Sequence, residues 1–96
     1  MRQLRSDFRF SEHAQHRFVE RSFSDECVDA IWEYGREYHA GSGCIALFLG
    51  KKEVAAARRR GLRIDQWMNK ALIIALDGVV VTLMNVFNIP RHWKGA

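Results

Sequence analysis

Apolar residues recur at helical spacing in two stretches near the beginning of the chain. Residues 12–21 contain no Gly or Pro, and the hydroxyl of Ser11 can accept a hydrogen bond from a free N–H of their first turn. Residues 25–34 follow Ser24 in the same way, begin with two carboxylates, which the helix dipole favours, and end before Gly35. The pattern therefore predicts two short helices with Ser11 and Ser24 as N-caps.

The rest of the chain contains apolar runs of strand length. Residues 36–40 suit a short edge strand, and residues 44–49 are continuously apolar, as in a strand that is buried on both faces. Two further runs, residues 71–76 and 79–87, flank an Asp-Gly pair. Asp-Gly between β-branched runs predicts a hairpin with a two-residue type I′ turn.

This turn fixes the register of the predicted hairpin. It pairs Leu76 with Val79, Ile74 with Val81, and Leu72 with Leu83. These bulky side chains are expected to face the helices, because residues at alternate positions share one face of a strand. Thr82 is out of phase with them and is expected to point to the other side of the sheet.

A short basic helix is predicted between the strands. Residues 51–60 contain three consecutive alanines, which favour helix, and end in three arginines, which suit a helix C-terminus before Gly61. Residues 62–69 fit either a further helical turn or an irregular connection. After Pro90, residues 91–94 are predicted to form a short basic tail.

Together these elements predict an α+β fold. Two N-terminal helices pack on one face of a three- to four-stranded antiparallel sheet, with the short basic helix between strands. The chain of 96 residues suits a single domain, residues 1–96, with its core at about residues 10–88. The uncovered face of the sheet, rimmed by basic residues, is the expected place for a site.

Composition adds an expected compartment to this picture. No apolar run approaches the length of a membrane span, and residues 1–10 intersperse Arg with other residues, unlike a secretory signal. We therefore expect a cytoplasmic protein, unless the chain is exported by another route or cut from a larger protein. In that compartment Cys27 and Cys44 are expected to be free thiols.

The basic residues are concentrated in the second half of the chain. The whole chain has a formal net charge of +4. Residues 1–50 hold six Arg and Lys against eight Asp and Glu, whereas residues 51–96 hold nine against three. Such an asymmetry attracts polyanions more strongly than the total suggests, and it favours a nucleic-acid partner.

Potentially chemical side chains share one face of the first predicted helix. His13, His16 and Arg17 stand at positions i, i+3 and i+4, and Arg21 extends this row by one turn. Two imidazoles beside two guanidiniums can bind a phosphate and move protons around it. The alternative is a solvated helix face, with surface histidines and with arginines that pair with carboxylates such as Glu20.

The order of these motifs along the chain is distinctive. The pattern is Ser11-Glu12-His13-Ala14, Arg17, Glu20-Arg21, the second helix from Ser24 to Gly35, and a late strand Val79-Val80-Val81-Thr82. It resembles a widespread bacterial domain family of unknown function, whose members open with a His-Ala-x-x-Arg helix and close with a Val-Thr strand. That family is similar to the barnase–EndoU–colicin–RelE class of folds, which includes many metal-independent ribonuclease toxins. The resemblance covers most of residues 10–86, but it includes neither His16 nor the arginine run.

The resemblance implies a toxin-type, metal-independent ribonuclease that acts on RNA phosphodiesters. On this hypothesis His13 is the base or acid, and Thr82 orients the substrate. Arg17 and Arg21 hold the phosphate through charge-assisted hydrogen bonds. Four further basic residues would hold the flanking RNA backbone, and these are Lys51, Lys52, Arg58 and Arg59.

The hypothesis requires the row on the first helix and Thr82 to meet in one open, cationic hollow. His16, or His39 from the predicted edge strand, is the candidate for a second proton transfer. No cofactor is expected. A metal site on His13 and His16 is the less favoured alternative, because its spacing matches no fixed zinc pattern. Its further ligand would come from His39, Cys44 or His92.

Two non-catalytic functions are also open from the sequence. The first is a binding module of the same fold, whose basic half holds nucleic acid or an acidic partner protein. A toxin of this class would also be expected to have an acidic inhibitor protein. The second is a structural subunit that associates through an apolar edge strand. Chelator-insensitive RNA cleavage, salt-sensitive RNA binding without cleavage, and a dimer without nucleic-acid affinity distinguish the three functions.

Overall fold

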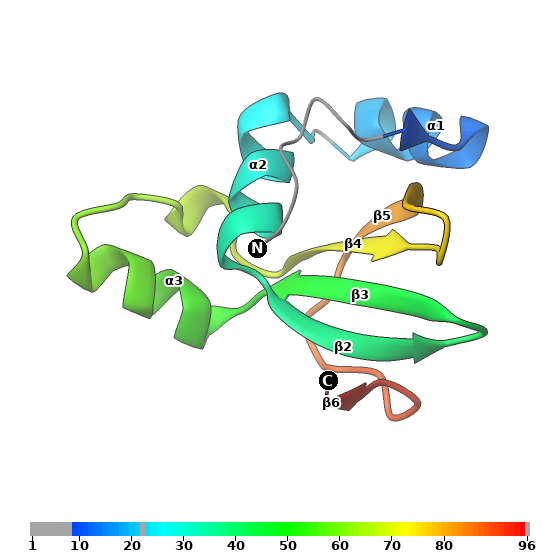
Figure 1. The fold of residues 1–96 in the computed structure, drawn as a ribbon. Helices are drawn as coiled ribbons and strands as arrows, with labels where there is room; N and C mark the ends of the chain where they lie inside the picture. The colour runs from blue at the N-terminus through cyan, green and yellow to red at the C-terminus, as the bar shows by residue number, and fades with distance from the viewer. Residues whose placement is uncertain (1–8, 22, 96) are drawn as a thin grey trace.

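The computed structural model of the protein describes residues 9–21 and 23–95 and is drawn as a ribbon in Figure 1. Within these residues, three α-helices and a six-stranded sheet form an α+β fold, which confirms the predicted class. No helix in the described ranges is long and apolar enough to cross a membrane. Most of the segment that was compared with a secretory signal, residues 1–10, lies outside the described residues.

Helices and strands alternate irregularly along the chain. The strands are β1 (Arg9–Phe10), β2 (Arg36–Gly41), β3 (Cys44–Leu49), β4 (Lys70–Ile74), β5 (Val79–Asn85) and β6 (Lys94–Gly95). The α-helices are α1 (Glu12–Glu20), α2 (Asp25–Tyr34) and α3 (Lys51–Arg59), and a short 3-10 helix, η2, covers Asp65–Trp67. The basic helix α3 therefore lies between strands as predicted, and η2 accounts for part of the connection at residues 62–69.

Both N-terminal helices begin at the predicted residues. Ser11 Oγ accepts a hydrogen bond from the N–H of Ala14 over 3.0 Å, and Ser24 Oγ accepts one from the N–H of Cys27 over 3.1 Å. The hydroxyl of Ser11 also donates to the carbonyl of Val81 over 3.0 Å. Ser11 therefore both caps α1 and ties the beginning of this helix to β5.

The sheet contains more strands than predicted, and it is mixed. Its order is β1-β5-β4-β3-β2-β6, with β1 parallel to β5 and every other neighbouring pair antiparallel. The prediction of a three- to four-stranded antiparallel sheet is therefore wrong at both edges. The missed strands, β1 and β6, have two residues each, and segments this short show no detectable alternation in the sequence.

The hairpin between β4 and β5 forms, but its loop contains three residues instead of two. The N–H of Gly78 donates to the carbonyl of Ala75 over 2.9 Å, and the N–H of Ala75 donates to the carbonyl of Val79 over 2.9 Å. Gly78 has φ +87°, the left-handed conformation that such loops require at their last position. Because the pairing shifts by one residue, Leu76 is 87% exposed rather than directed toward the helices.

A β-bulge in β5 restores the predicted register farther from the turn. Ile74 pairs with Val80 instead of Val81, whereas Leu72 pairs with Leu83 as predicted. Val81 is the extra residue of the bulged strand. As a result, Val80 is buried beneath the helices and Val81 packs on the other face of the sheet.

A hydrophobic cluster covers each face of the sheet. The first cluster lies between the sheet and the helices and includes the fully buried Ile31 of α2 and Leu72 of β4. The second cluster lies on the other face and includes Ala46, Ala71 and Trp93. The helices therefore cover one face only, and a segment near the C-terminus contributes to covering the other.

This C-terminal segment corrects three predictions. Residues 91–94 are not a free basic tail, because Lys94–Gly95 form β6 along β2. Trp93 is 7% exposed and packs on the sheet face that was expected to be uncovered. The core therefore extends beyond residue 88. In Figure 1 this segment runs below the sheet, on the side away from α1 and α2.

Candidate nucleic-acid interface

Two members of the predicted row meet on the surface of α1. Arg17 Nε donates to His13 Nε2 over 3.4 Å, and Arg17 Nη1 lies 3.4 Å from Glu20 Oε1. His13 and Glu20 are exposed, and Arg17 is partly exposed. The imidazole–guanidinium pair therefore forms. The alternative prediction, an arginine paired with a neighbouring carboxylate, also holds, because the same Arg17 side chain contacts Glu20.

The other two members of the row do not join this pair through any described contact. His16 is exposed and lines a hollow of about 390 Å³ together with Glu12, Gln15, Val19 and Glu20. Arg21 is the C-cap residue of α1 and is half-buried. The environment of His16 is therefore set by two carboxylates and does not resemble a phosphate-binding site.

Thr82 lies on the opposite face of the sheet from α1. Its partner across the hairpin is Ile73, which belongs to the second cluster, whereas the adjacent Leu83 is buried in the first cluster. Because successive strand residues point to opposite faces, the hydroxyl of Thr82 is directed away from His13 and Arg17. The structure therefore separates Thr82 from the row by the thickness of the sheet.

His39 is also remote from the row. It lies on β2, which is three strands away from β5, or about 14 Å at the usual strand spacing. Its cross-strand partners are Ile45 and Lys94. Among the residues that the structure describes, no group of three or more His, Cys, Asp or Glu side chains is placed to hold a metal ion.

All four residues predicted to hold the RNA backbone lie on α3 and are exposed. Two further exposed arginines, Arg60 and Arg63, follow them closely. The prediction left them out, although Arg60 completes the arginine run and Arg63 comes soon after it. We define the α3 surface as the exposed side chains of Lys51, Lys52, Arg58, Arg59, Arg60 and Arg63.

Buried contacts on the other side of α3 hold this surface in place. Val54 and Ala57 are each 2% exposed and pack in the first cluster. Glu53 Oε1 accepts a hydrogen bond from the N–H of Gly50 over 3.0 Å, which fastens the first turn. The helix is therefore anchored on its apolar side, and its cations remain in solvent.

A hollow of about 620 Å³ adjoins the C-terminal end of α3. Its lining residues are Arg58, Gly61, Arg63, Asp65 and Gln66. Arg58 forms an ion pair with Asp65, and both side chains are substantially exposed to water. Water therefore screens this pair. With two guanidiniums and one carboxylate, the hollow carries a net positive charge.

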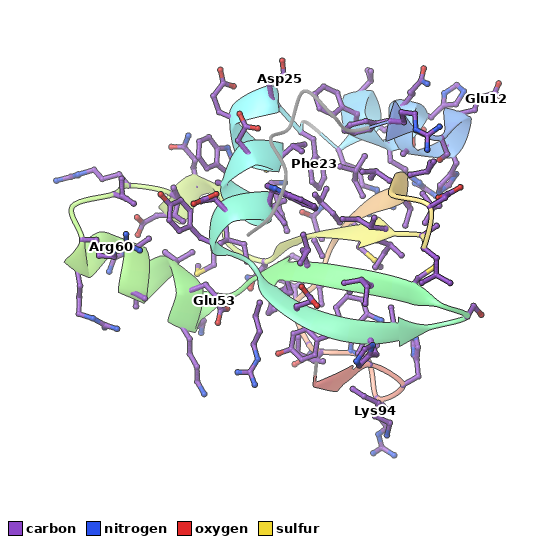
Figure 2. All side chains as sticks on the ribbon, in the orientation of Figure 1. Glu12, Phe23, Asp25, Glu53, Arg60 and Lys94 are labelled. Atoms are coloured by element: carbon purple, nitrogen blue, oxygen red, sulfur yellow. The ribbon has the colours of Figure 1, made fainter. Side chains whose placement is uncertain are left out.

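The net charge of the protein is concentrated at α3. Residues 51–65 hold six basic and two acidic residues, a balance of +4, which equals the formal net charge of the whole chain. Residues 12–21 hold two Arg and two Glu and are balanced. Figure 2 shows Arg60 and Glu12 on opposite sides of the molecule, so the two charged surfaces are separate.

The thiol of Cys27, a buried residue of α2, stays in its protonated form. Burial raises the pKa of Cys27 from 9.0 to about 11, although the positive charge of Lys70 and a hydrogen bond with the backbone at Ser24 oppose this shift. The thiolate is the nucleophilic form of cysteine. Cys27 is therefore protonated at neutral pH and contributes no nucleophile to a site.

Comparisons of the chain with protein-family models, with curated proteins and with solved structures gave no match. The resemblance to ribonuclease toxins therefore stays a prediction.

Proposed function

We propose that this protein binds RNA through the α3 surface, by contacts to phosphates rather than to particular bases. The observation that carries this proposal is the net charge of +4 on residues 51–65. Lys and Arg side chains that neutralise phosphates release the counterions condensed on a nucleic acid, and this release favours binding. A cytoplasmic location belongs to the same proposal.

The distribution of cations along α3 supports contact with more than one phosphate. Lys51 and Lys52 lie in the first turn, and Arg58 and Arg59 lie in the last. At 1.5 Å per residue these two groups are roughly 10 Å apart along the helix axis. They can therefore hold different phosphates of the same strand, while the hollow beside Arg63 is open to a further one.

The salt dependence of binding tests this proposal. We expect the logarithm of the association constant for a labelled RNA, measured by fluorescence anisotropy, to fall linearly with the logarithm of the salt concentration. Lys52→Gln should make the slope shallower by about 0.7 for a single strand. Arg9→Gln, on the edge strand β1 rather than on α3, removes the same charge and should leave the slope unchanged. Equal effects of the two variants would contradict the proposal.

Metal-independent RNA cleavage is a second candidate function, supported by the contact between His13 and Arg17. An imidazole can transfer a proton near neutral pH, and an adjacent guanidinium can stabilise the charge of the phosphorane. Thr82 has no part in this version of the mechanism, because it lies on the other face of the sheet. An acidic inhibitor protein, if the protein is toxin-like, would suit the α3 surface.

Incubation of labelled RNA with the protein in the presence of a chelator tests this second candidate. Cleavage should persist with the chelator, and His13→Ala should slow it by about 100-fold or more, as expected for the loss of a general acid or base. Arg17→Ala should also slow it, whereas Thr82→Ala should not. If the wild-type protein binds RNA in a salt-sensitive manner but does not cleave it, the cleavage function is ruled out and only the binding function stands.

A further inference from the structure

A stack of three side chains rises from the second cluster to the surface of β2. The ring centroids of Trp93 and Tyr38 are 5.8 Å apart, and the guanidinium carbon of Arg36 lies 5.6 Å from the centroid of the Tyr38 ring. Trp93 is buried, Tyr38 is half-buried and Arg36 is exposed. The stack therefore ends in a guanidinium that is supported on its inner side by an aromatic ring.

An aromatic residue on the next strand is paired with Arg36. Phe48 of β3 is the cross-strand partner of Arg36, and it is half-buried. Directly opposite residues of an antiparallel pair have side chains in contact range on the same face. The two side chains therefore leave the sheet on the same face, the guanidinium over the ring of Tyr38 and the phenyl ring against Gly50.

These two groups are continuous with the α3 surface. The ring of Phe48 lies against Gly50, where an added Cβ atom would come within 2.6 Å of it, and Gly50 is the N-cap of α3. Lys51 and Lys52 follow immediately and are exposed. Figure 1 shows β3 running directly into α3. A strand of nucleic acid held by the lysines can therefore extend over the Arg36–Phe48 pair.

We infer that Arg36 and Phe48 form a stacking platform that makes the protein prefer single-stranded RNA over duplex RNA. This inference rests on the proposed function, because the α3 surface supplies the phosphate contacts. Unpaired bases can stack on aromatic rings and on guanidinium planes, whereas the bases of an A-form duplex are already stacked on one another. Tyr38 is a positioning residue, since it holds the guanidinium of Arg36 in its stacked orientation.

The test compares binding of a fluorescein-labelled single strand of about 12 nucleotides with binding of the same strand annealed to its complement. Arg36→Lys keeps the charge but removes the planar group, and it should weaken single-strand binding about fivefold or more while changing duplex binding less than about twofold. Phe48→Leu should act in the same direction. Arg9→Lys, on β1, is the matched control and should change neither affinity.

Conservative variants separate stacking from loss of structure. Tyr38→Phe and Phe48→Tyr keep a ring at each position and should retain the single-strand preference, whereas Tyr38→Leu should lower it. Thermal unfolding of each variant shows whether its fold is intact. High salt weakens the phosphate contacts more than stacking, so the ratio of single-strand to duplex affinity should rise with salt.

The outcomes also distinguish this inference from the proposed function. If Lys52→Gln weakens binding but single strand and duplex bind equally, or if Arg36→Lys and Phe48→Leu affect both RNAs alike, the platform is overturned and phosphate binding at α3 stands. If the wild-type protein binds neither RNA, both are overturned. A single-strand preference that depends on Arg36 and Phe48 supports both.

Discussion

The surfaces of α1 and α3 both carry basic side chains, but their surroundings differ. On α1, Arg17 lies next to His13 and Glu20, and residues 12–21 as a whole are electrically balanced. On α3, six cations share their surroundings with two carboxylates, of which Glu53 is engaged with the backbone of Gly50. The first surface contains side chains of the kind that general acid–base catalysis uses, whereas the second contains the kind of charge that attracts polyanions.

This difference shows why the chemistry of a side chain and the net charge of its neighbours have to be considered separately when a binding site is predicted. An imidazole next to a guanidinium is a chemically suggestive pair, yet neighbouring carboxylates reduce its attraction for a polyanion. The plainer lysines and arginines of α3 attract a polyanion because little opposes them. The predictions below, from the largest effect to the smallest, test whether RNA responds to α3 and not to α1.

The largest effect is expected from removing two cations of α3. Arg58→Gln combined with Arg59→Gln should weaken RNA binding at low salt by about tenfold or more and make the salt slope shallower by about 1.4. Arg17→Gln combined with Arg21→Gln removes the same charge from the region of α1 and should change the affinity by less than about threefold. Anisotropy titrations measure both. A larger loss from the second pair would reverse the comparison.

The beginnings of the two helices differ in how firmly they are attached. Ser11→Ala removes both the N-cap bond of α1 and the bond to Val81 of β5, and should lower the free energy of unfolding by about 1–2 kcal/mol. Glu53→Ala removes one bond at the beginning of α3 and should cost about 0.5–1 kcal/mol. Urea denaturation measures both values. Equal losses would mean that the bond to Val81 contributes nothing.

A smaller effect is expected from the carboxylates that pair with arginines on each surface. Asp65→Asn frees Arg58 at the hollow beside α3 and should strengthen RNA binding about two- to threefold. Glu20→Gln frees Arg17 on α1 and should leave the affinity unchanged. Anisotropy titrations measure both affinities. A gain in affinity from Glu20→Gln alone would indicate that RNA binds at α1 instead.

The smallest effect at neutral pH concerns Cys27 of α2, which is buried in the first cluster. Its pKa is raised from 9.0 to about 11 in the folded protein. Between these values the unfolded chain releases the thiol proton and the folded chain keeps it, so stability should be unaffected below pH 9 and should fall as pH rises toward 11. The difference between wild type and Cys27→Ala in urea denaturation isolates this thiol. A difference that stays constant up to pH 11 would contradict the assignment.

Features with strong local causes could be predicted from the sequence. Ser11 and Ser24 precede runs of helical spacing, and both hydroxyls cap their helices as predicted. The hairpin was predicted from Asp-Gly, but its loop length was not, because Gly with positive φ serves both a two-residue loop and the last position of a three-residue loop. The predicted register is therefore off by one residue next to the turn, and the bulge in β5 restores the predicted pairing farther along the hairpin.

Features that depend on contacts distant in the sequence could not be predicted. Phe10 pairs with Val80, and Lys94 pairs with His39, yet nothing in either short strand signals its partner. For the same reason, the burial of Trp93 was missed. A short segment of polar residues around one tryptophan is compatible with a tail or with a strand, because the sequence alone does not show where the indole packs.

The candidate site shows the same division. The contact between His13 and Arg17 follows from their spacing of four residues on one helix. The relation of Thr82 to that pair depends on which face of the sheet the helices cover. The predicted register already placed Thr82 on the face away from the helices, so a shared hollow was inconsistent with it, and the structure keeps the two apart.

The two-residue strands at the sheet edges have a consequence for handling this protein. β6 is the outer neighbour of the six-residue strand β2, and it is held by only two register pairs. Removal of the residues after Pro90 would leave unpaired the backbone groups of β2 that now face β6, and would remove the Trp93 side chain from the second cluster. Two shortened chains could then pair with each other along their exposed β2 strands. We therefore expect the short strand β6 to protect this edge of the sheet from intermolecular pairing.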